Sequence, residues 1–179
     1  MTSSKIFDAL LVLQYRNGDQ KALGILVKRH HKTFCSHANW YLHDLDASKD
    51  VVQDSWGIII RKLHSLKDPN RFSSWAMRIV TRKSIDFINQ NKSKRERLRY
   101  YQQGNIHDSP KEETNSEIVQ LRGAIKSLSN DQQMVLRLFY TQDHSLLEIS
   151  EILDISVGTV KSRLYHAREK LKTILKNTS

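Results

Sequence analysis

Polar and cationic side chains gather on one side of a helix that the sequence predicts from Ser156 onward, near the C-terminal end of the chain. Hydroxyl, amine and guanidinium groups near the start of a helix can hydrogen-bond to base edges and phosphates in the major groove of DNA. The plainer interpretation is a solvated helix face, because basic residues are common on exposed helices. The residues that could contact DNA are Thr159, Lys161, Ser162, Arg163, Tyr165, His166 and Arg168.

A shorter helical pattern precedes this one and favours the DNA-binding interpretation. Ser145 and Glu148 have the spacing of a capping box, so a helix is expected to begin there. Asp154 tolerates a left-handed backbone, and it lies where a sharp turn must separate the two helices. Ser156 is a good N-cap for the second helix, whose apolar residues recur at helical spacing. Residues 145–175 are therefore predicted to form a helix-turn-helix that binds DNA.

Two carboxylates stand one helical turn apart in a second polar stretch. Asp50, Gln53 and Asp54 share one side of a predicted helix, which is expected to begin at Asp46 or Ser48. Asp50 and Asp54 repel each other, a small cost that a purely structural helix need not carry and that a basic partner would offset. The alternative is that Asp50 favours the helix N-terminus while Asp54 is solvated. The buried side of this helix is expected to comprise Val52, Trp56, Ile59 and Leu63.

A third polar stretch is cationic and follows a loop at residues 67–70. The helix predicted over residues 71–91 carries arginine and lysine beside apolar residues, and further basic side chains follow over residues 92–99. Phosphate contacts need charge and little geometry, so this surface is suited to follow a nucleic-acid backbone. The residues expected to pack are Phe72, Trp75, Ile79, Ile85 and Ile88.

The composition agrees with a polyanionic partner. The chain has 179 residues, with 29 lysines and arginines against 19 acids, for a net charge of +10. Nucleic acid is favoured over a membrane surface, because no basic segment is paired with a strongly apolar helix face. No apolar run is long enough to span a bilayer, and nothing at the N-terminus resembles a signal peptide. A cytoplasmic protein without membrane insertion is therefore expected.

The single cysteine, Cys35, excludes an internal disulfide. His31 and Cys35 have the i, i+4 spacing with which two side chains can share a metal, but no second cluster supplies further ligands. We therefore expect no metal and no cofactor, and we interpret the thiol as structural or exposed.

The chain is predicted to be all-α, because it has two prolines, six glycines and no stretch of alternating β-branched residues. Residues 101–114 lose the apolar period and become acidic, which is typical of a flexible linker. Two small helical domains joined by this linker are predicted. Helices are expected over residues 6–16, 20–42 and 71–91, and Asp131 is expected to cap the helix that supports the helix-turn-helix.

Several motifs together resemble bacterial sigma-70 factors of the extracytoplasmic-function (ECF) type. The segment SVGTVKSRL at residues 156–164, followed by Ala167 and Arg168, is similar to the family's C-terminal signature. The segment DVVQD at residues 50–54 is similar to the most recognisable stretch of sigma domain 2. The motif GDQKA at residues 18–22 fits the same family in order and spacing, and so do Phe72, Trp75, Arg78, Ile79 and Asp86.

The resemblance implies an alternative sigma factor, a non-enzymatic protein that binds core RNA polymerase and directs promoter-specific initiation. Residues 1–98 would be sigma domain 2, residues 99–114 a linker and residues 115–179 sigma domain 4, whose helix-turn-helix reads the minus-35 element of promoter DNA. The residues implied in minus-10 recognition and melting are Asn70, Arg71, Trp75, Arg78, Arg82 and Lys83.

The resemblance also implies protein partners. Asp50, Gln53 and Asp54 would dock on the clamp helices of the largest polymerase subunit, and the flap of the second-largest subunit would be a further contact. An anti-sigma factor that masks the two domains is another partner consistent with the family.

Two other functions fit parts of the sequence. A helix-turn-helix regulator that never touches polymerase would explain residues 145–175 but not the DVVQD segment. An enzyme acting on nucleic acid would need a carboxylate cluster, a metal-binding spacing or a nucleophile beside a base, and none stands out. The sigma-factor interpretation accounts for all three polar stretches.

Overall fold

The computed structural model describes the backbone of residues 3–98 and 116–176, with the side chains of residues 3–90 and 120–176, and every regular element in these ranges is helical. The chain divides into two compact units, Met1–Gln102 and Gln103–Ser179. The predicted all-α class with two helical domains is therefore confirmed. The linker predicted over residues 99–114 lies outside the described residues.

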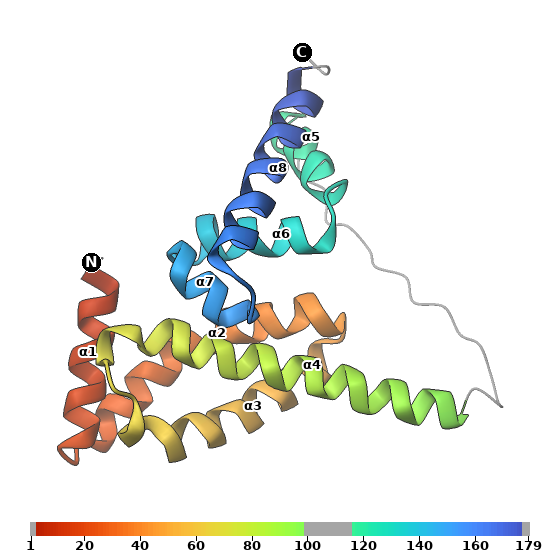
Figure 1. Ribbon diagram of the computed structural model, residues 1–179. Helices are drawn as coiled ribbons and strands as arrows, with labels where there is room; N and C mark the ends of the chain where they lie inside the picture. Colours follow the sequence, from red (N-terminus) through yellow and green to blue (C-terminus); the bar gives the residue numbers. More distant parts are fainter. Residues whose placement is uncertain (1–2, 99–115, 177–179) are drawn as a thin grey trace. The chain divides into compact units, whose positions relative to one another are not determined.

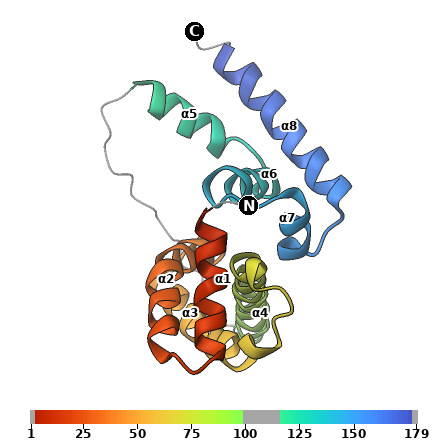
Figure 2. The same ribbon diagram turned by 90° about the vertical axis from the view of Figure 1, so that its left-hand side faces the viewer.

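The first unit is a bundle of long helices in which α2 packs against the other three (Figure 1). Figure 2 shows α1 lying alongside α2. Two 3-10 turns, η1 and η2, lie between α3 and α4, and α1 packs against both of them. The elements are α1 (Ser3–Arg16), α2 (Gln20–Leu42), α3 (Leu45–Lys62), η1 (Leu63–Ser65), η2 (Pro69–Arg71) and α4 (Phe72–Leu98).

The core of the first unit contains the stripe predicted for α3. Val52, Ile59 and Leu63 are fully buried and Trp56 is nearly so, as predicted. The ring of Phe34 on α2 lies 5.4 Å from that of Trp56, centroid to centroid. Burying side chains of this size contributes roughly 1.5–3 kcal/mol each. This stripe therefore fixes which side of α3 faces outward.

The prediction that Ile85 packs inside is wrong, because its side chain is 42% exposed. Ile85 follows Arg78 and Arg82 at helical spacing, so it shares their outward side of α4. Phe72 is fully buried, and its burial confirms the start of the packed face.

Helix α3 begins earlier than predicted. The N-cap is Asp44, whose carboxylate accepts hydrogen bonds from the backbone N–H groups of Asp46 (2.9 Å) and Ala47 (3.0 Å). The preceding helix ends at Leu42, and His43 takes a left-handed conformation with φ of 52°. Only a two-residue connection remains, so Asp44 is where the cap must lie, rather than Asp46 or Ser48.

In the second unit, the helix α6, against which α8 packs, also begins earlier than predicted. Ser129, not Asp131, caps α6: its hydroxyl accepts from Gln132 N at 3.3 Å, and the Gln132 side chain accepts from Ser129 N at 3.2 Å. This reciprocal pair is a capping box. The elements are α5 (Ser116–Lys126), α6 (Asn130–Leu136), a π-helical segment (Arg137–Thr141), α7 (Leu146–Leu153) and α8 (Val157–Lys176).

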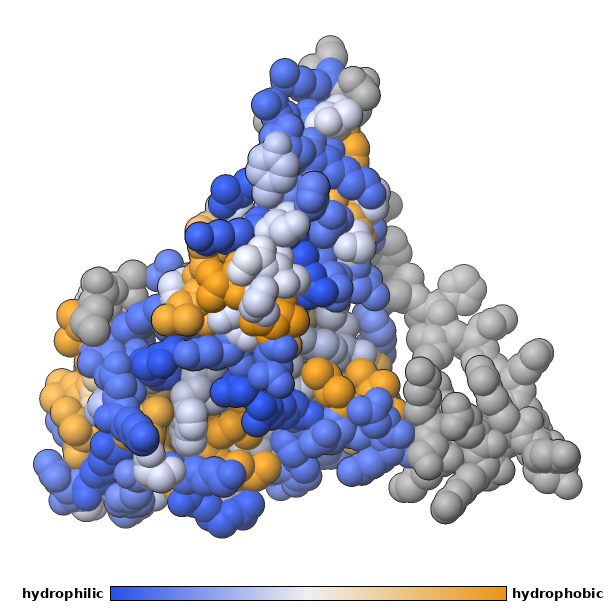
Figure 3. All heavy atoms as spheres, viewed as in Figure 1, coloured by the Kyte–Doolittle hydropathy of each residue, from blue (hydrophilic) through white to orange (hydrophobic). Residues whose placement is uncertain are grey.

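The outer side of α1 is apolar. Ile6, Leu10 and Leu13 recur at helical spacing and stay 54%, 48% and 46% exposed, whereas Leu11 and Val12 are buried. Figure 3 shows hydrophobic side chains over α1 at the left edge of the molecule. The buried side of α1 is therefore narrow, and polar contacts contribute to its attachment.

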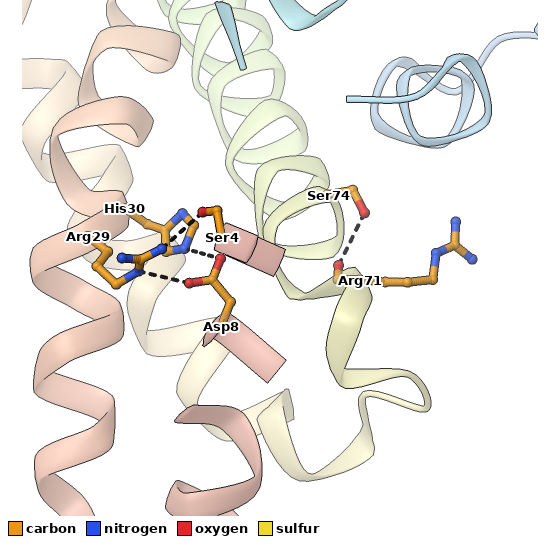
Figure 4. A network of polar contacts seen from close by, with 6 residues as sticks. All are labelled: Ser4, Asp8, Arg29, His30, Arg71 and Ser74. Carbon is orange, nitrogen blue, oxygen red and sulfur yellow. Dashed lines mark hydrogen bonds and ion pairs between the residues drawn. The ribbon is translucent and has the colours of Figure 1, made fainter. Parts of the chain in front are cut away.

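A buried carboxylate attaches α1 to α2 (Figure 4). Asp8 is 2% exposed and accepts hydrogen bonds from Arg29 Nε and His30 Nε2, each at 2.9 Å. Burial acts to raise the pKa of Asp8, but the hydrogen bonds and charges of His30 and Arg29 outweigh it and hold that pKa below its ordinary value. Arg29 also donates to Ser4 Oγ at 3.0 Å and lies over the Phe7 ring. These contacts hold the N-terminal half of α1 in place.

We predict that Asp8→Asn destabilises the first unit by about 2 kcal/mol, because a buried charged hydrogen-bond acceptor is lost. Since the native pKa is depressed, the stabilisation is present above the ordinary value of 3.8 and is lost as pH falls through the native pKa. Urea denaturation at several pH values measures both effects. The control is Asp46→Asn, which breaks an exposed ion pair with Lys49 and should change stability little. Equal stability of Asp8→Asn and wild type near neutral pH would contradict this account.

Candidate nucleic-acid interface

Helices α7 and α8 form the predicted helix-turn-helix. Ser145 N donates to Glu148 Oε2 at 2.7 Å, and Glu148 N donates to Ser145 Oγ at 3.3 Å, so the predicted capping box is confirmed. Asp154 takes the left-handed conformation with φ of 58° and ψ of 44°, and its N–H bonds to Ser150 O. The left-handed conformation predicted for Asp154 in the turn between the helices is therefore confirmed.

The start of α8 is held by two hydroxyl groups. Ser156 Oγ accepts from Thr159 N at 3.0 Å, as expected of the predicted N-cap, and lies 2.8 Å from Thr159 Oγ1. Thr159 is half-buried. The structure therefore places Thr159 in the cap, where it fixes the first turn of α8.

The exposed face of α8 carries polar side chains of several kinds. Val160, Leu164 and Ala167 are buried along the opposite side. The Tyr165 side chain is 62% exposed, and its ring lies 5.4 Å from that of His166. The predicted DNA-contacting residues that lie together on this exposed face are Lys161, Ser162, Tyr165 and His166.

The two arginines of α8 lie at the flanks of its buried stripe and have partners inside their own unit. Arg163 Nη2 forms an ion pair with Asp131 Oδ2 at 2.6 Å. The guanidinium of Arg168 lies over the rings of Phe139 (5.6 Å) and Tyr140 (5.5 Å). Both contacts connect α8 to the α6 region, so these arginines fix the orientation of the exposed face.

Helix α4 presents a stripe of guanidinium groups and one indole ring. Trp75, Arg78 and Arg82 follow one another at spacings of three and four residues, so they share one side of α4, and Arg71 lies immediately before α4 as the last residue of η2. Trp75 is half-buried and Arg82 is exposed. The structure therefore brings these four predicted residues together.

Lys83 differs from this group. It is rotated away from the stripe, and its Nζ lies 3.5 Å from Asp54 Oδ2 on α3. This ion pair joins a residue predicted to bind DNA to one predicted to bind polymerase, and both are accessible enough for it to be weak.

Asn70 lies in the 3-10 turn immediately before α4. Asp68 Oδ1 accepts from both Asn70 N and Asn70 Nδ2 at 3.0 Å, and Arg71 N donates to Asp68 O at 3.0 Å. Asp68 caps the 3-10 turn η2, which includes Arg71, and α4 begins at Phe72, one residue later than predicted. Figure 4 shows the Arg71 side chain extended away from the Asp8 cluster, while Ser74 Oγ donates to Arg71 O at 3.1 Å.

The predicted acidic face of α3 is exposed. Asp50, Gln53 and Asp54 are all accessible, on the side opposite the buried stripe. They form an acidic surface on a strongly basic chain. A cationic partner surface would suit this face.

His31 Nε2 lies 3.5 Å from Cys35 Sγ, and burial raises the pKa of the Cys35 thiol. In the part of the chain that the structure describes, no three histidine, cysteine or acidic side chains meet as a metal site. The described helices also include none that is both long and apolar enough to cross a membrane.

Two parts of the chain match two regions of one protein family. Sigma-70 region 2 matches residues 26–94, which include α3, the loop and most of α4. Sigma-70 region 4 matches residues 118–171, which include α7 and most of α8. The chain belongs to the sigma-70 family. The family predicted from the motifs is therefore confirmed.

Curated relatives place this sigma-70 protein in the ECF type. Sigma-E of Salmonella typhimurium is 29% identical over 94% of both chains. Sigma-E of Escherichia coli K12 is 28% identical over 94% of both chains. SigW of Bacillus subtilis is 28% identical over 93% of this chain and 95% of its own. The protein is thus an ECF sigma factor and not an enzyme.

Solved structures share the sigma-factor fold. Bartonella quintana RpoE, solved with the anti-sigma factor NepR, has a TM-score of 0.68 at 19% identity, covering 87% of this chain and 98% of its own. CnrH, solved with the cytosolic domain of CnrY, has a TM-score of 0.61 at 26% identity, covering 97% of this chain and 99% of its own.

Proposed function

We propose that this sigma factor directs initiation through three separate faces. Domain 2, residues 1–98, binds core RNA polymerase through α3 and the minus-10 element through α4 and its preceding loop. Domain 4, residues 115–179, reads the minus-35 element through α8, and residues 99–114 link the two domains. The observation that carries the proposal is that the outward faces of α3, α4 and α8 have three different chemistries.

The acidic face of α3 suits a basic helical partner. Asp50, Gln53 and Asp54 project from adjacent turns, so they can engage one rod-like surface such as the clamp helices of the largest polymerase subunit. Electrostatic complementarity of this kind speeds association and sets the register of docking. A helix-turn-helix regulator that never binds polymerase has no use for this face.

The stripe on α4 suits a DNA strand that has been opened. Arginine side chains can neutralise phosphates, and an indole ring can stack on an unpaired base for roughly 1–3 kcal/mol. Trp75 stands between Arg71 and Arg78 on the stripe, so base and backbone contacts lie side by side. Asn70 can add a hydrogen bond to a base edge, and Lys83 lies at the border with the polymerase-binding face.

The exposed face of α8 suits the major groove of a duplex. Lys161, Ser162 and Tyr165 offer donors and acceptors in the first turns of the helix, with His166 beside them. Thr159 fixes the first turn, and Arg163 and Arg168 can reach phosphate from the flanks. The polymerase flap is the partner that we expect to hold this domain in place.

Regulation by an anti-sigma factor is part of the proposal. CnrH, which is 26% identical, was solved with a protein partner, the cytosolic domain of CnrY. A protein that covers α3 or α4 would block polymerase and promoter together, since Asp54 and Lys83 place these faces next to each other. We expect the sigma factor to act in the cytoplasm, where polymerase and promoter DNA meet.

We predict that Asp50→Lys or Asp54→Lys weakens binding to core polymerase by about tenfold or more, because like charges across an interface cost several kcal/mol. Fluorescence titration of labelled sigma factor with core polymerase, without DNA, measures the affinity. Lys83→Gln is the matched control, because it breaks the Asp54 ion pair and leaves the acidic face unchanged. If a variant that carries both Asp50→Lys and Asp54→Lys bound core polymerase with wild-type affinity, these acids would be only surface residues.

We predict that Lys161→Ala costs ~1–3 kcal/mol on the preferred minus-35 sequence and relaxes preference at one position, because Lys161 faces base edges. Arg168→Ala should instead weaken all sequences about equally, because this side chain orients α8 and reaches phosphate. Binding-site selection with randomised duplex DNA compares the two variants. An unchanged sequence preference for Lys161→Ala and a changed one for Arg168→Ala would reverse the assignment.

A further inference from the structure

The last residue of α1 holds the turn that leads into the loop before α4. Arg16 Nη2 donates to Leu63 O at 2.9 Å and also to Leu66 O, while Arg16 Nε lies 3.3 Å from Leu63 O. Beside it, the rings of Tyr15 and His64 lie 5.6 Å apart. A single guanidinium thus joins both ends of the turn at residues 63–66 to the first helix.

The two carbonyl groups need this partner. Leu63 and Leu66 are 0% and 7% exposed, and the bonds from Arg16 to their carbonyl groups are part-buried, so a carbonyl left there without a hydrogen bond would be costly. The backbone offers only a long bond across the turn, from Leu66 N to Leu63 O at 3.4 Å. A planar guanidinium can donate to two acceptors at once, whereas an ammonium is a compact point charge.

The turn sets the starting point of the segment assigned to the minus-10 strand. Asp68 lies two residues after Leu66, and its carboxylate accepts hydrogen bonds from both the backbone N–H and the side-chain amide of Asn70. α1 also packs against η2, which contains Asn70 and Arg71. A change in the turn at residues 63–66 would therefore displace Asn70 and Arg71 relative to α4.

We propose that Arg16 is a positioning residue for the capture of the opened minus-10 strand by residues 67–71. It acts through the carbonyl groups of Leu63 and Leu66 and does not itself contact DNA. The inference rests on the proposed function of this loop. Helix α1 lies before the segment that matches sigma-70 region 2. The inference gives this helix a part in base discrimination.

The test measures base discrimination by the full-length protein in the holoenzyme. Wild-type holoenzyme first selects its preferred strand from a randomised single-stranded DNA pool, and that strand and its point variants then serve as fluorescent probes. Arg16→Gln should reduce the ratio of affinities for the preferred and substituted strands by at least about fivefold, the size of one typical base preference. Arg16→Lys keeps the charge but not the two-acceptor geometry, so it should show an intermediate loss. Core binding and duplex minus-35 binding should stay within about twofold of wild type.

The controls separate this inference from the proposed function. Lys62→Gln removes the same charge from an exposed side chain beside the turn and should keep wild-type discrimination. Asn70→Ala and Arg71→Ala report whether the loop reads the strand at all. If they reduce discrimination and both Arg16 variants keep it, the positioning role is wrong and the loop's function stands. If Asn70→Ala and Arg71→Ala also leave discrimination unchanged, the loop's function fails and the inference fails with it.

Discussion

Burial of one apolar stripe on each helix decides which side chains of α3, α4 and α8 can meet a partner. Turning α8 far enough to hide Lys161 and Tyr165 would expose Val160 and Leu164, at a cost of roughly 2 kcal/mol for each. An exposed ion pair contributes no more than about 1 kcal/mol, so surface contacts cannot overcome that cost. The polar faces are therefore presented by the core before any partner binds.

Polar contacts outside the core also help to fix the orientation of the helices. Arg163 with Asp131, and Arg168 with Phe139 and Tyr140, connect the flanks of α8 to neighbouring elements. In the first unit, Asp8 connects α1 to α2 in the same way, through its hydrogen bonds with Arg29 and His30. Each contact joins residues that are distant in the chain, so each couples the placement of one helix to another. On α8, Arg163 and Arg168 therefore hold the binding face in place from its flanks, whereas Lys161 and Tyr165 lie on the exposed face itself.

Local sequence signals predicted the features that local chemistry determines. The capping box of Ser145 and Glu148, the left-handed Asp154 and the buried stripe of α3 each depend on residues within a few positions of one another. The exposed residues of α8 followed from the same helical spacing. The polar stretches of the candidate interface were therefore found from the sequence, as was the all-helical class.

The exact ends of helices and the contacts between distant residues were missed. The cap of α3 lies at Asp44 because α2 ends at Leu42 and His43 takes the left-handed conformation, so only two residues connect the helices. Asp131 has the composition of a cap, yet Ser129 takes that place and Asp131 pairs with Arg163 on α8. Nothing within a few residues of Arg16 indicates that it bonds to carbonyl groups 47 and 50 positions away. The spacing S-x-x-Q at residues 129–132 was a signal that could have placed the α6 cap correctly.

The central claim, that these faces bring core RNA polymerase to promoters, is tested most directly by run-off transcription from a genomic promoter library. Core polymerase is assayed with and without the full-length protein, under otherwise identical conditions. The account predicts discrete transcripts that require the protein and start downstream of a shared two-part DNA element. The absence of any protein-dependent transcript with every core polymerase tested would contradict it.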